Sequence, residues 1–250
     1  RLRSRGLGDV YKRQVLIKGK KYIQKIFYKQ RVVMVHIISA QHSICNRFLA
    51  EIRDREKQKD RMRFRRNMER VGEIMAYEIS KTFTYTKCCV QTPINPAEVM
   101  VPAKSVVIAT VLRAGLPFHQ GFLNYFDDAG NAFISARRTS CVDGQVEVRF
   151  DSIYTPDLRG KQLLLVDPML ATGSSLVIAY RELLAQGCCP EHTHIAAVIA
   201  SKQGVAYVEK ELAGEPVTVW TAALDEALTE KFYIDPGIGD AGDLAFGEKK

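Results

Sequence analysis

The sequence predicts an α/β fold in which a mainly parallel sheet is flanked by helices. From Ser105 onward, short apolar runs rich in β-branched residues alternate with segments of helical periodicity. The runs are continuously apolar, which is typical of strands that helices cover on both faces. The chain has 250 residues, 46% of them hydrophobic, and is long enough to bury a core. Ligands of such folds bind at the carboxyl ends of the strands, so we expect the functional residues there.

The α/β core is expected over residues 105–250. Strands are predicted at residues 105–112, 132–136, 162–166, 193–200 and 217–220. Helices are predicted at residues 116–126, 174–186 and 203–212, and Gly187 is typical of the position just after a helix. Residues 139–157 alternate as a β-hairpin does, around a turn at Asp143 and Gly144.

An N-terminal helical segment is expected over residues 34–104. Residues 47–83 read as helical, because Phe64, Met68, Val71 and Met75 have the spacing of one apolar stripe. Acidic residues are interleaved with the arginines of this region, which favours a solvated helix face over a nucleic-acid patch. A polar stretch that contains three prolines (Pro93, Pro96 and Pro102) is expected to separate these helices from the core.

The positive charge of the chain is confined to one end. The formal net charge is +8, but residues 1–33 hold eleven basic residues and one acid, so that residues 34–250 have a net charge of −2. A transit peptide, a nucleic-acid-binding arm and translated sequence upstream of Met34 are the three interpretations of this basic leader. We favour the third, in which residues 1–33 are not part of the native fold and residues 34–250 form a single domain.

Cysteine and hydropathy patterns favour a cytoplasmic protein. The six cysteines come without a secretory signal or a C-x-x-C motif, which favours a reducing compartment. No apolar run approaches the roughly 18 residues that a membrane helix needs, so no membrane partner is expected. His192 and His194 precede an apolar run without a nearby third ligand, and we interpret them as residues at the start of a strand and not as metal ligands.

The most informative stretch for chemistry is residues 163–175, LLLVDPMLATGSS. A buried strand ends at Asp167, and the small residues from Ala171 to Ser175 lead directly into a helix. Backbone N–H groups and hydroxyls at such a turn can converge on a phosphate, and the acid before it can accept hydrogen bonds from a sugar. P-loop and dinucleotide-binding motifs are absent from the turn. The alternative interpretation is an ordinary strand-to-helix turn that Ser174 or Ser175 caps.

Two further segments have the composition of binding loops. Arg113 follows the first core strand, where its guanidinium could clamp a diphosphate, and Gly115 allows either a close backbone approach or a positive φ. Residues 233–243, YIDPGIGDAGD, form a rigid loop whose main-chain groups could read a flat, uncharged base. A surface arginine and a tight loop are the corresponding structural interpretations.

Together these segments resemble the type I phosphoribosyltransferases. The run Asp-Pro-Met-Leu-Ala-Thr-Gly at residues 167–173 is similar to the signature of the uracil phosphoribosyltransferases, and VLRAG (111–115) and YIDPGIGDAGDLAFG (233–247) agree with it. The resemblance covers residues 34–250. It implies transfer of a phosphoribosyl group from phosphoribosyl pyrophosphate (PRPP) to uracil, which gives uridine monophosphate and diphosphate.

The resemblance also implies roles for individual residues. Arg113, Arg138 and Asp167 are implied as catalytic, and the hairpin over residues 139–157 as a flap. The PRPP site would comprise Arg113, Arg138, Asp167, Pro168, Met169, Leu170, Ala171, Thr172, Gly173, Ser174, Ser175 and Asp240. The uracil site would comprise Ile234, Gly239, Asp240 and Ala241. Magnesium would be bound by PRPP and not by direct protein ligands. The reaction would pass through an oxocarbenium-like state. The chain would form a homo-oligomer.

Three positions depart from the family pattern. Arg137 precedes Arg138 and could share or take its role, Ser174 stands where a second glycine is usual, and Asp235 replaces an apolar residue of the base loop. Two alternatives to the uracil reaction follow. A phosphoribosyltransferase for another base is one, although orotate would call for a positive charge that the base loop lacks. A nucleic-acid-binding regulator is the other, although the net charge of −2 over residues 34–250 disfavours it.

Overall fold

The computed structural model describes residues 16–17, 20–21, 33–140, 146–186 and 189–248. The chain divides into two compact units, Arg1–Gln30 and Arg31–Lys250. In the first unit, β1 (Leu16–Ile17) and β2 (Lys20–Lys21) pair antiparallel. The rest of this description concerns the second unit. That residues 1–33 are not part of the native fold stays a prediction.

A 7-stranded sheet forms the centre of the second unit, in the order β3-β11-β10-β9-β6-β7-β8. The strands are β3 (Met34–Ile37), β6 (Val106–Leu112), β7 (Gly130–Ser140), β8 (Val146–Tyr154), β9 (Gln162–Leu170), β10 (His192–Ser201) and β11 (Val217–Asp225). Every neighbouring pair is parallel except β7 with β8. The predicted α/β fold with a mainly parallel sheet is therefore confirmed.

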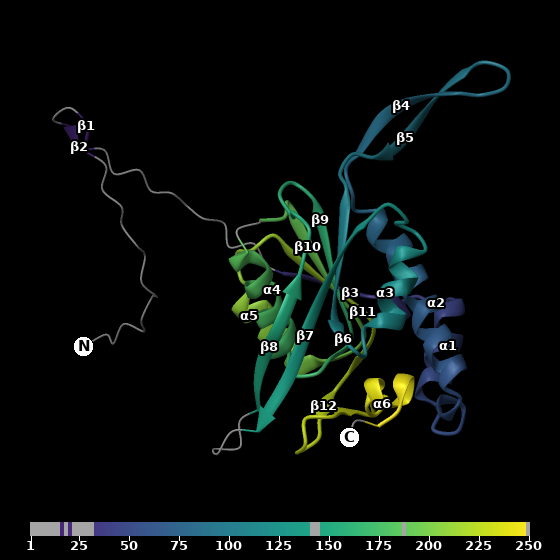
Figure 1. Ribbon diagram of the computed structural model, residues 1–250, viewed down its shortest axis with the longest axis vertical. Coiled ribbons are helices and arrows are strands. Elements are labelled where there is room, and N and C mark those ends of the chain that lie inside the picture. Colours follow the sequence, from purple (N-terminus) through teal and green to yellow (C-terminus); the bar gives the residue numbers. More distant parts are fainter. Residues whose placement is uncertain (1–15, 18–19, 22–32, 141–145, 187–188, 249–250) are drawn as a thin grey trace, which may run out of the picture. The chain divides into compact units, whose positions relative to one another are not determined.

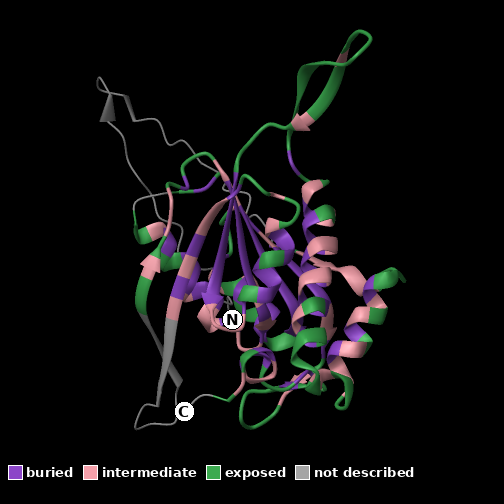
Figure 2. Ribbon diagram, turned by 45° about the vertical axis from the view of Figure 1, so that its right-hand side comes forward, coloured by how far each residue is buried: buried purple, intermediate pink, exposed green. Residues whose placement is uncertain are grey.

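Helices cover both faces of the sheet (Figure 1). One layer contains α1 (Ile44–Arg53), α2 (Arg61–Ser80), α3 (Leu116–Leu123) and α6 (Ala241–Phe246), and the other contains α4 (Ser174–Ala185) and α5 (Lys202–Glu211). Side chains alternate between the layers along each strand. In β9, Leu164 and Val166 pack with the first layer, and Leu163 and Leu165 with the second. The strands are accordingly buried through most of their length (Figure 2).

The prediction that residues 47–83 are helical is correct for most of this segment, but the segment forms two helices and not one. The predicted apolar stripe of α2 is buried. However, α1 ends at Arg53 and α2 begins at Arg61, with the short 3-10 helix η2 (Lys57–Lys59) between them. The break has a local cause, because Asp54 accepts hydrogen bonds from the N–H groups of Glu56 and Lys57, and Asp60 caps α2.

Strands that the sequence did not predict flank the helices at both ends of residues 34–104. β3, which the 3-10 helix η1 (Ile38–Ala40) follows, adds a parallel edge strand beside β11. The polar stretch with three prolines is an antiparallel hairpin of β4 (Tyr85–Gln91) and β5 (Pro96–Pro102). Thr92 closes its turn by accepting from the N–H groups of Ile94 and Asn95. This hairpin is largely exposed. It extends outward at the opposite end of the sheet from α6 (Figures 1 and 2).

The hairpin predicted over residues 139–157 is formed by β7 and β8, which pair antiparallel from Phe133 and Tyr154 to Ser140 and Val146. Its turn residues Asp143 and Gly144 lie outside the described residues. After β11, the short strands β12 (Ala227–Leu228) and β13 (Ile234–Asp235) lead into α6. None of the helices in the described ranges has the length and apolar character needed to cross a bilayer.

Candidate active site

Three predicted loops lie at the carboxyl edge of the sheet. β6 and β9 are parallel neighbours, with Thr110 opposite Val166, so the loop after β6 lies beside the segment that begins at Asp167. The Thr110 hydroxyl ties these strands together by donating to Val166 O at 3.0 Å. Ala114, in the loop after β6, is 3.8 Å from the position that a Cβ would take on Gly242 in α6. Three predicted binding segments are therefore neighbours. They are the phosphate turn (residues 171–175), the diphosphate loop that carries Arg113, and the base loop (residues 233–243).

Close backbone packing shapes the loop that carries Arg113. Gly115 N–H donates to Val111 O at 3.2 Å. A Cβ on Gly115 would meet the Thr110 hydroxyl and Val111 O at distances no side chain tolerates. Gly115 is thus required by steric crowding and not by a positive φ, since its φ is −72°.

Arg113 itself points toward α6. Its Nη2 donates to Gly247 O at 3.2 Å and lies 3.5 Å from Asp243 Oδ1. The Arg113 side chain is 39% exposed, which leaves it accessible to an anion from solvent. Its Nε is buried and has no hydrogen-bond partner in the described part of the chain. Arg113 can therefore bind a diphosphate only with some exchange or sharing of these partners.

The predicted phosphate turn joins β9 to α4. Asp167 lies near the end of β9, and its Oδ1 accepts from Met169 N–H at 3.0 Å. The hydroxyls of Thr172 and Ser174 are 2.8 Å apart. Gly173, which precedes the helix, has φ of +81°. Hydroxyls and helix N–H groups thus meet at the positive end of a helix dipole, which is an arrangement suited to phosphate.

Helix α5 supports this turn from behind. Ser201 donates from Oγ to Ala171 O at 2.6 Å and accepts from Gly204 N–H at 2.8 Å. A Cβ on Gly204 would lie 2.2 Å from Ala171 O, and one on Gly173 would lie 2.7 Å from Gly204 O. Backbones of the two segments therefore pack directly on each other, which fixes the turn to the layer below it.

The base loop runs from β13 to α6. Ile234 and Ala241 are buried at its ends, and Gly239 has φ of +84°. Asp240 caps α6 by accepting from Asp243 N–H at 3.0 Å. Asp235 is exposed, so its charge is solvated. The loop offers backbone groups from glycines and small residues, as an uncharged planar ligand requires.

The assignment of Arg138, or of its neighbour Arg137, as the arginine that contacts PRPP stays a prediction. Both lie on β7, with Arg137 opposite Arg149 and Arg138 opposite Val148 on β8. The placement of their side chains lies outside the described residues. Their backbone position, beyond the Leu112 and Ser135 pair of β6 and β7, is on the carboxyl side of the sheet.

The structure adds three charged residues that the sequence reading did not select. Asp243 faces Arg113, while Arg53 at the end of α1 and Asp225 at the end of β11 pair with each other and contact the base loop. The sequence could have indicated Asp225, since it is an acidic residue at the carboxyl end of an apolar run. The predicted strand at 217–220 ended too early to place it there. No local sequence pattern indicates Arg53, because its role depends on residues far away in the chain.

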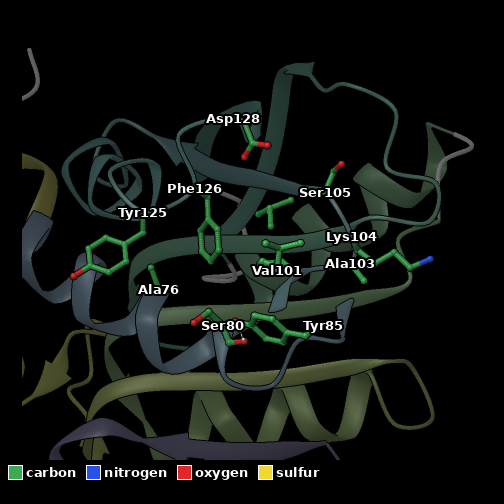
Figure 3. Close-up of a pocket in the computed structure, with 12 residues that line it drawn as sticks. Ala76, Ser80, Tyr85, Val101, Ala103, Lys104, Ser105, Tyr125, Phe126 and Asp128 are labelled. Carbon is green, nitrogen blue, oxygen red and sulfur yellow. Dashed lines mark hydrogen bonds between the residues drawn. The ribbon is translucent and has the colours of Figure 1, made fainter. Parts of the chain in front are cut away.

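A hollow of about 500 Å³ lies elsewhere, beside the base of the β4 and β5 hairpin. Its lining includes the aromatic side chains of Tyr85, Tyr125 and Phe126 (Figure 3). Tyr85 donates to Ser80 O across one side of it. The described ranges contain no group of three or more His, Cys, Asp or Glu residues that could hold a metal ion. The predicted site is thus a set of converging loops, and this hollow is not part of it.

Comparisons with known proteins agree with one another. Residues 38–248 match the family described as Uracil phosphoribosyltransferase. The chain is 52% identical to a uracil phosphoribosyltransferase of Porphyromonas gingivalis over 86% of this chain and 99% of that protein. It is 36% identical to one of Pyrococcus furiosus over 80% and 84% of the two chains. The structure is similar to that of the AQ2163 protein from Aquifex aeolicus, with a TM-score of 0.76, 27% identity, and coverage of 86% of this chain and 98% of that one.

Proposed function

The chain belongs to the uracil phosphoribosyltransferase family, and from this premise we propose which residues carry its reaction. The enzyme converts uracil and PRPP into uridine monophosphate and diphosphate. One observation supports our assignment of residues most strongly, namely that the Arg113 loop, the Asp167 to Ser175 turn and the base loop adjoin at one edge of the sheet. That is where a donor with one phosphate and one diphosphate group must meet the acceptor base.

PRPP binds to the first two of these segments. The turn from Ala171 to Ser175 holds a phosphate group with its hydroxyls and helix N–H groups. Asp167 accepts hydrogen bonds from the ribose hydroxyls, and Pro168, Met169 and Leu170 connect it to the turn. Arg113 and Arg138 bind the diphosphate, because a guanidinium presents paired donors to phosphate oxygens. Asp240 closes the site from the side of the base loop.

Uracil is bounded by Ile234, Gly239, Asp240 and Ala241. A pyrimidine without charge needs donors and acceptors in a plane, and the backbone of this loop supplies them. Because the loop contains no basic residue between Ile234 and Ala241, a base that carries a carboxylate gains no ion pair there. The loop therefore favours uracil over orotate.

The reaction is a displacement at the anomeric carbon. The bond from C1′ to the diphosphate oxygen breaks, the bond from C1′ to N1 of uracil forms, and the N1 proton passes to solvent water. PRPP would enter as its magnesium complex, in which the metal would supply positive charge at the diphosphate. The chain positions both substrates, and Arg113 and Arg138 stabilise the leaving group as its charge develops. No covalent intermediate with the protein is required.

A turnover assay tests this proposal directly. We expect uridine monophosphate from uracil and PRPP with Mg²⁺, loss of activity with a chelator, and at least about a hundredfold lower kcat/KM with cytosine, orotate or hypoxanthine. Equal turnover of a second base would overturn the assignment of the base loop. Activity that survives the chelator would overturn the role of magnesium. Salt-sensitive RNA binding by a chain that starts at Met34 would revive the regulator interpretation.

We further propose a cytoplasmic homo-oligomer. The β4 and β5 hairpin supports the proposal of a homo-oligomer, since Ile94 at its turn is 88% exposed and Met100 is 56% exposed. Apolar side chains on an extended hairpin are typical of surfaces that another chain covers. Light scattering after size exclusion should give a mass of at least two chains, and a monomer at micromolar concentration would contradict this.

A further inference from the structure

Asp225 is a buried carboxylate with a dense set of partners. It lies at the carboxyl end of β11 and is 6% exposed. Arg53, the last residue of α1, binds it with both arms of the guanidinium, Nη2 to Oδ1 at 2.7 Å and Nη1 to Oδ2 at 2.9 Å. Such a pair of parallel hydrogen bonds fixes the orientation of the carboxylate and also stabilises its negative charge. The carboxylate is thus held firmly, 172 residues away in sequence from its partner.

The third member of this cluster is the backbone of Gly237, within the base loop. Gly237 N–H donates to Asp225 Oδ2 at 2.9 Å, and Gly237 O accepts from Arg53 Nη1 at 3.0 Å. The two side chains therefore hold both polar groups of one glycine. Gly237 has φ of +55°, and a Cβ there would lie 2.1 Å from Ile234 O. A glycine is required by this tight turn, and the ion pair fixes its orientation.

The neighbouring residue is held from the same side. With its amide nitrogen turned toward them, Gln58 donates to Ile238 O at 3.1 Å and to Ile52 O at 3.0 Å. Ile238 is itself buried. The contacts reach the middle of the loop, between Ile234 and Gly239, which both belong to the proposed uracil site. The conformation of the base loop is thus determined from α1 and from the segment that follows it.

We propose that Arg53 and Asp225 are positioning residues for recognition of the base. The inference rests on the proposed function of the base loop, and it assigns these two residues no contact with substrate. By fixing Gly237, they set the direction of the backbone groups that read uracil in Gly239, Asp240 and Ala241. In the described part of the chain, their side-chain hydrogen bonds go to each other and to Gly237. Their effect should therefore fall on the base and not on PRPP.

Steady-state kinetics of variants test this positioning role. In Arg53→Lys a single ammonium cannot reproduce the paired contacts with Asp225 and the bond to Gly237 O. We expect the KM for uracil to rise about tenfold to a hundredfold, because small misplacements of binding groups are costly. The KM for PRPP should change by less than about threefold, and discrimination between uracil and cytosine should weaken.

Controls separate the positioning role from loss of folding and from failure of the proposed function. Arg47→Lys alters an arginine of the same helix that is 73% exposed and pairs only loosely with Glu51, so its kinetics should match those of the unmodified enzyme. Arg53→Met with Asp225→Asn removes the pair without leaving one charge buried alone, which protects folding, and it should repeat the uracil effect. Equal changes in both KM values, or none, would overturn the inference. An unmodified enzyme that does not use uracil would overturn the proposed function instead.

Discussion

The guanidinium of Arg113 and the carboxylate of Asp243 face each other across the candidate site, with Nη2 and Oδ1 3.5 Å apart. Asp243 also donates its N–H to Asp240, the residue that caps α6. The diphosphate loop and the base loop are therefore connected through one ion pair. At this distance the pair is loose, and both partners are more than a third exposed. A diphosphate carries more charge than one carboxylate and can replace it.

Replacement of Asp243 should strengthen binding of PRPP. Asp243→Asn keeps the shape of the side chain and the backbone contact with Asp240, but it removes the charge that competes for Arg113. An exposed ion pair contributes about 0.2–1 kcal/mol, so we expect the KM for PRPP to fall by about 1.4-fold to fivefold while kcat changes little. Initial rates at saturating uracil measure this. A higher KM would mean that Asp243 orients Arg113 for the substrate and does not compete with it.

Removal of the Arg113 side chain should damage the chemical step. Arg113→Ala deletes donors that face the developing charge of the leaving diphosphate, and such losses cost about 10²-fold or more in rate. Arg181→Ala is the matched control, because Arg181 pairs with Glu211 on α4 and α5, away from the loops of the site. The kcat/KM for PRPP should drop only in the first variant. If Arg113→Ala retained half of the activity, another group would have to stabilise the diphosphate.

Two glycines with similar φ angles should respond differently to substitution. Gly173 (φ of +81°) and Gly160 (φ of +69°) both adopt left-handed conformations, which cost an L-residue about 1–2 kcal/mol. A Cβ at Gly160 meets nothing within 4 Å, whereas one at Gly173 presses on Gly204 O at 2.7 Å. Gly160→Ala should therefore lower the free energy of unfolding only. Gly173→Ala should also displace the phosphate turn and raise the KM for PRPP by about tenfold or more, and equal kinetics in the two variants would contradict this.

How far the sequence predicts the structure depends on the range of the interactions involved. The continuous apolar runs and the stripe from Phe64 to Met75 depend on local periodicity, and both are buried as expected. The β4 and β5 hairpin was missed because its prolines lie at the turn and at the ends of strands, where they are compatible with pairing. The pairing of Arg53 with Asp225 was not predictable from spacing. It joins residues from opposite ends of the chain, and only the completed sheet brings them together.

His194 belongs to a buried aromatic cluster on the sheet. Trp220 Nε1 donates to its Nδ1 at 3.1 Å, and Trp220 stacks on His36 of β3 with ring centres 4.0 Å apart. His194 Nε2 is buried and has no hydrogen-bond partner among the described residues. Burial, followed by repulsion from His192 and His36, lowers the pKa of His194 from 6.5 to about 3. The folded protein therefore keeps this imidazole neutral where the unfolded chain would take up a proton.

Acid should destabilise the fold through His194. Between pH 6.5 and about pH 3 the unfolded state binds the additional proton, so stability falls as the pH falls, by at most about 1.4 kcal/mol per pH unit from this group. Above pH 6.5 both states are neutral and the contribution is constant. His194→Gln retains an acceptor for Trp220 but cannot be protonated, so its thermal midpoint should decline less between pH 6.5 and pH 4.5. Parallel declines in the two proteins would show that His194 takes up a proton equally in both states, in which case its burial does not oppose the charge.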